Sequence, residues 1–143
     1  METKWREVTS AECQDDFDDL LEVCVEIAAE RIIENWGLGP VAVVNHMSLG
    51  QSVFRPEDEA DTASTITAQE QLVGRLRAVA DEVRSYAIVF DATAEGASNT
   101  HLEVLLEHRE YAMHIHVPYV ISDKRTFDLG PMKASVGRQL LWG

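Results

Sequence analysis

Two histidines stand one residue apart in the stretch YAMHIHVPY, at His114 and His116. Apolar and polar residues alternate along this stretch, and the same alternation runs from His101 to Leu106. A period of two predicts β-strands that have one buried face and one wet face. Imidazole nitrogens and carboxylate oxygens are common ligands of zinc and other divalent metals. A metal site is therefore the sharpest chemical hypothesis that the chain offers.

The register of the predicted hairpin decides which polar residues share a face. Apolar residues are even-numbered on the first arm and odd-numbered on the second, so facing residues must differ in parity. A tight turn at His108–Arg109 would place Glu103 opposite His114, and His101 opposite His116. The register that buries the apolar residues thus gathers four candidate metal ligands on one polar face: His101, Glu103, His114 and His116.

A sheet with one solvated face gives the same pattern without a metal. Histidine and glutamate serve on such a face, and a His-x-His pair also arises by chance. Pro118 cannot donate a hydrogen bond to a neighbouring strand, which places this arm at an edge or beside a bulge, open to solvent. Solvated or cross-strand-paired histidines are the simpler interpretation, with no cofactor, and zinc or another divalent metal is the alternative.

Catalytic signatures are missing from the sequence. It contains no GxSxG, GxxxxGK[ST], GxGxxG or HExxH motif. His46 and Asp91 each end an apolar predicted strand, where the sites of α/β folds often gather. A catalytic His46–Asp91 pair is one interpretation, and an Asp91 that caps or turns the following loop is the other. Whether the protein is an enzyme stays open.

Length and charge restrict the protein class. The 143 residues predict a single domain, 1–143. The formal net charge of −13 argues against binding to nucleic acid or to an anionic membrane, and allows a basic protein partner. The first residues, METKWREVTS, have no apolar segment of a secretory signal, so we expect a cytoplasmic protein. An acidic decoy of a nucleic-acid-binding protein is a further interpretation of the charge.

The two cysteines are predicted to be reduced and buried. Cys13 and Cys24 lie on one predicted helix, about 16 Å apart at 1.5 Å per residue, which is too far for a disulfide.

Two amphipathic helices are predicted. The first spans about 10–35, with Thr9 and Glu12 as a capping box and Gly37, Gly39 and Pro40 as the stop. Its acidic residues are predicted to lie on a solvated side opposite the apolar stripe. The second begins with a capping box at Thr67 and Glu70 and ends near residue 85.

The remaining segments predict strands and loops. Strands are expected at 41–46, 51–54 and 86–92 and in the hairpin after residue 100, with polar loops at 55–64 and 93–100. The segment after residue 126 is ambiguous between a strand and a short helix. The expected fold is α+β, of order αββαβββ, with two amphipathic helices packed on an antiparallel or mixed sheet of about five strands.

The stretch from SYAIVFDA to HLEVLLEHREYAMHIHV resembles small uncharacterised prokaryotic α+β proteins. In those, a strand and a polar loop precede an "EVLL" hairpin, which Glu103, Val104, Leu105, Leu106, Glu107 and Arg109 match here. His108 and Glu110 depart from the usual acidic residue and glycine. The resemblance implies no activity. The element order is also similar to that of roadblock and longin-type modules, which implies dimerisation or scaffolding.

The leading expectation is therefore a small binding or assembly module without catalytic activity, acting as a homodimer through a sheet edge or a helix face. The alternative is a metal-binding protein or metal-dependent enzyme that uses His101, Glu103, His114 and His116.

Overall fold

The computed structural model describes residues 5–33, 40–48, 50–54, 65–91, 100–121 and 126–142. The predicted helix stop at Gly37 and Gly39 and the predicted polar loop at 55–64 lie outside these residues. The same holds for residues 93–99 of the loop predicted at 93–100, and for Ala92 at the end of the strand predicted before it.

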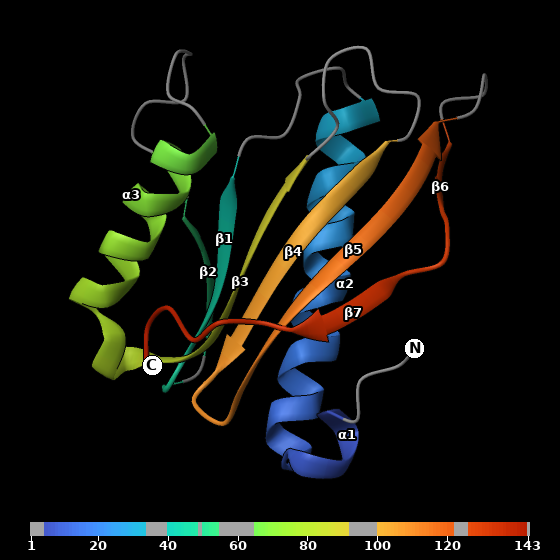
Figure 1. Cartoon of the computed structure of the whole chain (residues 1–143). Helices are drawn as coiled ribbons and strands as arrows, with labels where there is room; N and C mark the ends of the chain where they lie inside the picture. Colours follow the sequence, from blue (N-terminus) through green and yellow to red (C-terminus); the bar gives the residue numbers. More distant parts are fainter. Residues whose placement is uncertain are drawn as a thin grey trace.

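The described chain forms two long helices, a one-turn helix and seven strands (Figure 1). The helices are α1 (Trp5–Val8), α2 (Ala11–Ile33) and α3 (Thr65–Ala78), followed by a 3₁₀ turn at Ala80–Glu82. The strands are β1 (Val41–His46), β2 (Gln51–Phe54), β3 (Val83–Asp91), β4 (His101–His108), β5 (Tyr111–Ile121), β6 (Phe127–Leu129) and β7 (Lys133–Val136).

The strands form one sheet in the order β2-β1-β3-β4-β5-β6, and β7 also pairs with β5. Every pair in it is antiparallel. The α+β class and the two amphipathic helices are confirmed, whereas the prediction of about five strands is wrong. The two additional strands come from the ambiguous segment after residue 126. They are three and four residues long and are separated by Gly130, Pro131 and Met132, so no alternation could develop.

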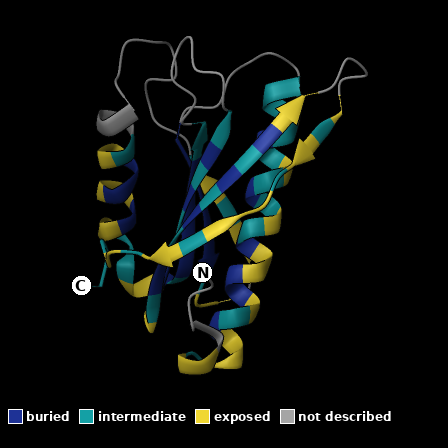
Figure 2. Ribbon diagram, turned by 45° about the vertical axis from the view of Figure 1, so that its right-hand side comes forward, coloured by how far each residue is buried: buried dark blue, intermediate teal, exposed yellow. Residues whose placement is uncertain are grey.

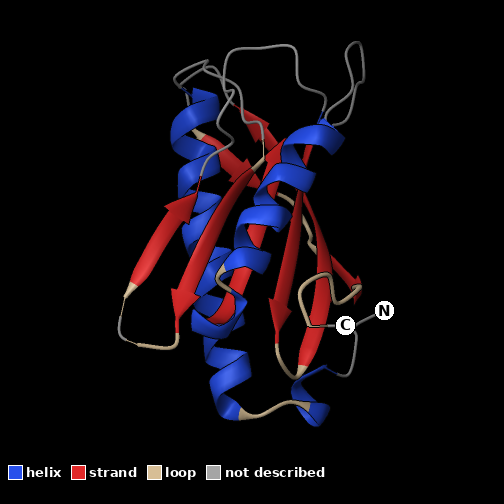
Figure 3. Cartoon of the chain, turned by 90° about the vertical axis from the view of Figure 1, so that its left-hand side faces the viewer, coloured by secondary structure: helices blue, strands red, loops and turns tan. Residues whose placement is uncertain are grey.

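α2 and α3 cover opposite faces of the sheet (Figures 1 and 3). The apolar stripe predicted for α2 packs against residues of β1, β3, β4 and β5 in one core, with Phe17, Leu20, Cys24 and Ala28 buried. Leu72, Val73 and Leu76 of α3 pack on the other face, against β1 and β3. α3 packs over β1 and β3 and leaves most of β4 and β5 uncovered on this face (Figure 1). The candidate ligands lie on this less covered part of the α3 face.

The boundaries of the helices differ from the predictions in three places. The N-cap of α2 is Ser10 rather than Thr9, because the Ser10 Oγ accepts the Cys13 N–H at 3.2 Å. α3 begins at Thr65, so Thr67 lies within the helix. It ends at Ala78, and Val83, predicted as helical, begins β3. The 3₁₀ turn and the strong β-propensity of the following residues explain the early end.

Asp16 departs from the predicted solvated side of α2. It is 5% exposed, and its carboxylate pairs with the Arg84 guanidinium at 2.9 Å on each oxygen. The Ser85 hydroxyl also donates to it at 2.6 Å. The hydrogen bond from Arg84 to Asp16 raises the pKa of the guanidinium. Asp16 thus fastens α2 to β3.

The C-terminal strap, residues 137–142, crosses the α3 face of the sheet and ends beside α3 (Figure 1). Gly137 donates its N–H to the Ala112 carbonyl, and a Cβ at Gly137 would lie 2.9 Å from the Met113 backbone. The strap then meets the buried Glu107, whose oxygens accept the N–H groups of Leu140, Leu141 and Trp142 at 3.0–3.2 Å. The strap therefore covers the α3 face of the sheet near the β4–β5 turn.

None of the helices in the described chain is both long and apolar enough to cross a membrane.

Candidate metal centre

All four candidate ligands lie on the α3 face of the sheet. His101 and Glu103 come from β4, while His114 and His116 come from β5, and their neighbours Leu102, Val104, Ile115 and Val117 are buried in the α2 core. Side chains of a strand alternate between the two faces, so the buried neighbours force the polar residues outward. The prediction that these four residues share one polar face is confirmed.

The predicted pairing within that face is wrong. The turn is at Arg109–Glu110, so Glu103 faces His116, His101 faces Pro118, and His114 faces Leu105. Moving the turn by one residue shifts each facing partner by two, which preserves the face of every side chain. The tip is placed by tertiary contacts. Arg109 donates to the Ala80 carbonyl at 3.0 Å, and Glu110 accepts hydrogen bonds from Ser10.

Glu103 is the centre of the cluster. Its Oε1 lies 3.3 Å from the Nε2 of His101 and 3.6 Å from the Nδ1 of His116. Its Oε2 is hydrogen-bonded to the Nε2 of His114. The Glu103 side chain is 18% exposed, whereas the side chains of His101, His114 and His116 are 24%, 42% and 41% exposed. The carboxylate is therefore the most buried group of the cluster. Three imidazoles from two strands therefore converge on one partly buried carboxylate.

The spacing of three of these groups fits a metal ion. One ligand atom each from His101, Glu103 and His116 all lie within 4.8 Å of one another. In a tetrahedral zinc site with bonds of about 2.0–2.1 Å, ligand atoms are about 3.3 Å apart. The two distances to Glu103 Oε1 are close to this value. The third, between the two imidazole nitrogens, is at most 4.8 Å, and the two rings stack at 4.2 Å between centroids.

His114 would not bind the ion itself but would support the ligand Glu103. It contacts the second carboxylate oxygen, so it can orient Glu103 while the first oxygen binds the ion. Its side chain is 42% exposed.

The neighbouring strand β7 adds two residues that the sequence did not indicate. Lys133 faces His116 and Ser135 faces His114 in the β5–β7 pairing. The Pro118 arm was predicted to lie at an edge or beside a bulge, and it is not an edge strand, because β5 lies between β4 and the pair of short strands. Pro118 accepts from the Gly130 N–H at 2.8 Å, in the gap between β7 and β6. N–H and C=O of one residue point to the same side of a strand, so the missing donor faces this gap.

The alternative catalytic pair is excluded by strand direction. His46 faces Val83 at the beginning of β3, whereas Asp91 ends that strand. Eight residues of extended strand separate these positions by about 26 Å. His46 is hydrogen-bonded to the Ser52 hydroxyl at 2.7 Å, and Asp91 accepts from the Tyr119 hydroxyl at 2.8 Å. Each polar residue has a local structural partner.

The cysteines are free and buried, as predicted. Burial raises the pKa of each thiol to about 12, and nearby carboxylates, that of Glu110 foremost, add to the effect at Cys13. A thiol that stays protonated near neutral pH is a poor nucleophile and a poor metal ligand. The candidate chemistry of the described chain therefore lies on the histidine face.

Comparison with protein families, with curated proteins and with solved structures found no match for this chain. The resemblances to small prokaryotic proteins and to roadblock or longin-type modules stay predictions.

Proposed function

We propose that the protein binds a divalent transition metal ion, with zinc as the first candidate, through His101, Glu103 and His116. The observation that carries the proposal is the convergence of these three ligand atoms within 4.8 Å on the open α3 face. Two nitrogens and one oxygen suit zinc, because its sites commonly combine histidine with a carboxylate.

The placement of the ligands on two paired strands favours a pre-formed site. Glu103 and His116 are paired with a neighbouring strand on both sides, and His101 is paired with β5, so the backbone places the three Cα atoms before an ion binds. A rigid set of ligands loses little conformational freedom on binding, which strengthens the affinity.

Three protein ligands leave a tetrahedral ion with one open position. Zinc sites of this type keep a water or a ligand there, whereas purely structural sites have four protein ligands. A metal held in this way could polarise a bound molecule or activate a water. The proposed site is therefore suited to ligand binding at the metal as well as to metal storage.

Zinc titration of protein purified without a histidine tag tests the proposal. We expect about one zinc ion per chain by calorimetry and by elemental analysis, and a rise in the thermal unfolding midpoint. Glu103→Gln and His116→Ala should weaken binding at least tenfold, an effect of about 1.4 kcal/mol or more.

His46→Ala is the matched control, because His46 is bonded to Ser52 at a different strand. It should bind zinc like the wild type. A wild-type protein that binds no zinc, and whose unfolding midpoint does not change on addition of zinc, would rule the site out.

Self-association is a second candidate function, and the distribution of exposed apolar side chains favours it. Most of the large apolar side chains that are exposed in the described chain come from one edge of the sheet: Val120, Ile121, Leu129, Met132 and Val136. Figure 2 shows this edge, formed by β6, β7 and the end of β5, largely in the exposed colour. Apolar edge strands are a common site of pairing between chains. A second copy of the chain is the proposed partner, and the mass in solution decides it.

A further inference from the structure

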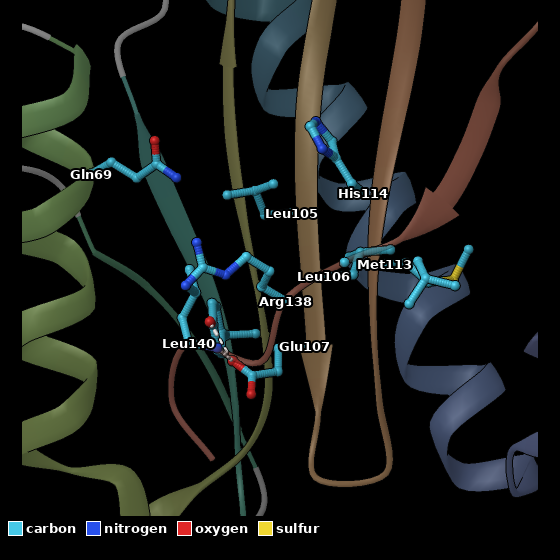
Figure 4. Close-up of a pocket in the computed structure, with 11 residues that line it drawn as sticks. Gln69, Leu105, Leu106, Glu107, Met113, His114, Arg138 and Leu140 are labelled. Atoms are coloured by element: carbon cyan, nitrogen blue, oxygen red, sulfur yellow. Dashed lines mark hydrogen bonds between the residues drawn. The ribbon is translucent and has the colours of Figure 1, made fainter. Parts of the chain in front are cut away.

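A pocket of about 300 Å³ adjoins the histidine face. It lies between α3, the strands β4 and β5, and the C-terminal strap, and Figure 4 shows Gln69 reaching in from α3 and Arg138 from the strap. Leu105 and Leu140 supply apolar walls. This volume is at the lower end for ligand sites, so the pocket suits a small molecule.

His114 links the pocket to the proposed metal site. His114 lines the pocket and is also hydrogen-bonded to Glu103. Leu105 lies two residues along β4 from Glu103 on the same face, a separation of about 7 Å. A molecule of a few heavy atoms could therefore touch the metal and the pocket together.

The charges around the pocket favour an anion. No hydrogen bond or ion pair joins the Arg138 guanidinium to any residue that the structure describes. The nearby Glu107 carboxylate is already occupied by the Tyr86 hydroxyl and by the N–H groups of the strap. On the other side, the exposed Lys133 lies beside His116. Two cations thus border this face in a chain whose net charge is −13.

We infer that this pocket binds a small organic anion, a carboxylate or a phosphonate-like group, whose oxygens pair with Arg138 while a second polar group reaches the metal. The inference rests on the metal site proposed above. A guanidinium offers paired donors that match carboxylate and phosphate oxygens, and its charge has no competing partner among the described residues. Leu105 and Leu140 would contact the carbon skeleton of the ligand.

Calorimetry of the zinc-loaded protein with succinate and with phosphonoacetate, which each carry two anionic groups, tests the inference. We expect the wild type to bind at least one of these probes, and Arg138→Gln to bind it at least about tenfold more weakly. Arg138→Lys should recover part of the affinity. Arg75→Gln is the matched control, because Arg75 is an exposed cation over Phe54, outside the pocket. It should bind like the wild type.

The outcomes separate the two proposals. Arg138 lies outside the metal ligand set, so Arg138→Gln should bind zinc as the wild type does. Zinc binding without any binding of the probes, or with equal affinity in wild type and Arg138→Gln, overturns the anion site and leaves the metal site standing. If no zinc binds, the metal site fails. The same titration of the metal-free protein with the probes then decides the anion site. Weaker binding of a probe by Arg138→Gln than by the wild type supports the site, and equal binding or no binding overturns it.

Discussion

At the scale of residues, the buried carboxylate of Asp16 joins α2 to the sheet. Asp16 accepts two hydrogen bonds from Arg84 and one from Ser85, and Ser85 in turn accepts from the Asn45 amide at 3.2 Å. The network connects α2, β3 and β1 on the edge of the main core. Its neighbour Asp15 is exposed to solvent on the same helix. Asp15 and Asp16 are therefore adjacent in the sequence, but only Asp16 faces the sheet and has a structural role.

Asp16→Asn should destabilise the fold by about 3 kcal/mol, measured as the free energy of unfolding in urea. The substitution leaves the Arg84 guanidinium without its counter-charge. The expected value is at the low end for a broken buried ion pair, because 32% of the Arg84 side chain stays exposed. Asp15→Asn, the control, should change stability by less than about 0.5 kcal/mol. Equal effects of the two substitutions would contradict a structural role for the ion pair.

At the scale of elements, the hairpin of β4 and β5 caps the start of α2. Glu110 at the hairpin tip accepts the Ser10 N–H at 2.9 Å and the Ser10 hydroxyl at 2.5 Å. In a capping box the reciprocal carboxylate comes from the third residue of the helix, which Glu12 was predicted to supply. Here it comes from a strand turn a hundred residues later. Beside it, the buried His108 lies 3.2 Å from Glu12, so the tip and the helix start form one unit.

Glu110 should make stability depend on pH. The hydrogen bonds from Ser10, that of the hydroxyl first, lower the pKa of the Glu110 carboxyl in the folded protein. A group whose folded pKa is lowered contributes stability above its unfolded pKa, and the contribution disappears as the pH falls through the folded pKa. Wild type should therefore be more stable than Glu110→Gln at about pH 7, and the difference should be smaller at about pH 3, because the contribution decreases as the pH falls toward the lowered folded pKa.

The free energies of unfolding of wild type and Glu110→Gln, measured at both pH values, check this prediction. Because both proteins carry the same other carboxylates, the difference between the two proteins at each pH isolates the effect of Glu110. Glu22→Gln, at an exposed position of α2, should match the wild type at both. A difference for Glu110→Gln that is undiminished in acid would show that the negative charge is not what Ser10 recognises.

On the scale of the whole molecule, acidic and histidine surfaces lie on opposite sides of the sheet. Exposed carboxylates follow the outer side of α2, at Glu12, Asp15, Asp18, Asp19, Glu22, Glu26 and Glu30. The histidine face and its two neighbouring cations lie across the sheet, beside α3. Much of the acidic charge of the described chain therefore lies on α2, across the sheet from the side where we place the ligands. The apolar β6–β7 edge borders the histidine face.

If two copies pair through this edge, light scattering after gel filtration should give twice the chain mass of 16.0 kDa. Val136→Lys should then shift the protein toward the monomer, because a charge at this 68% exposed position opposes the pairing of two edges. Val8→Lys is the control, since Val8 is 67% exposed on α1 and away from the edge. A wild type with the mass of one chain at all concentrations would contradict this candidate.

The sequence by itself determined the faces of the elements. Periods of about 3.6 and of two identified the buried stripe of α2 and the shared face of His101, Glu103, His114 and His116. A face depends only on the local geometry of a helix or a strand. The shared face does not depend on the position of the turn, because a shift of the turn by one residue does not exchange the faces.

Only the tertiary structure decided which of these groups meet. The hairpin register depends on Arg109 and Glu110, whose partners lie in β3, the 3₁₀ turn and α2, far away in the sequence. Asp16 is buried because Arg84 comes to lie beside it, and Arg138 borders the histidine face because the strap crosses the sheet. Periodicity carries no signal for such contacts, since they follow from how the completed elements pack against one another.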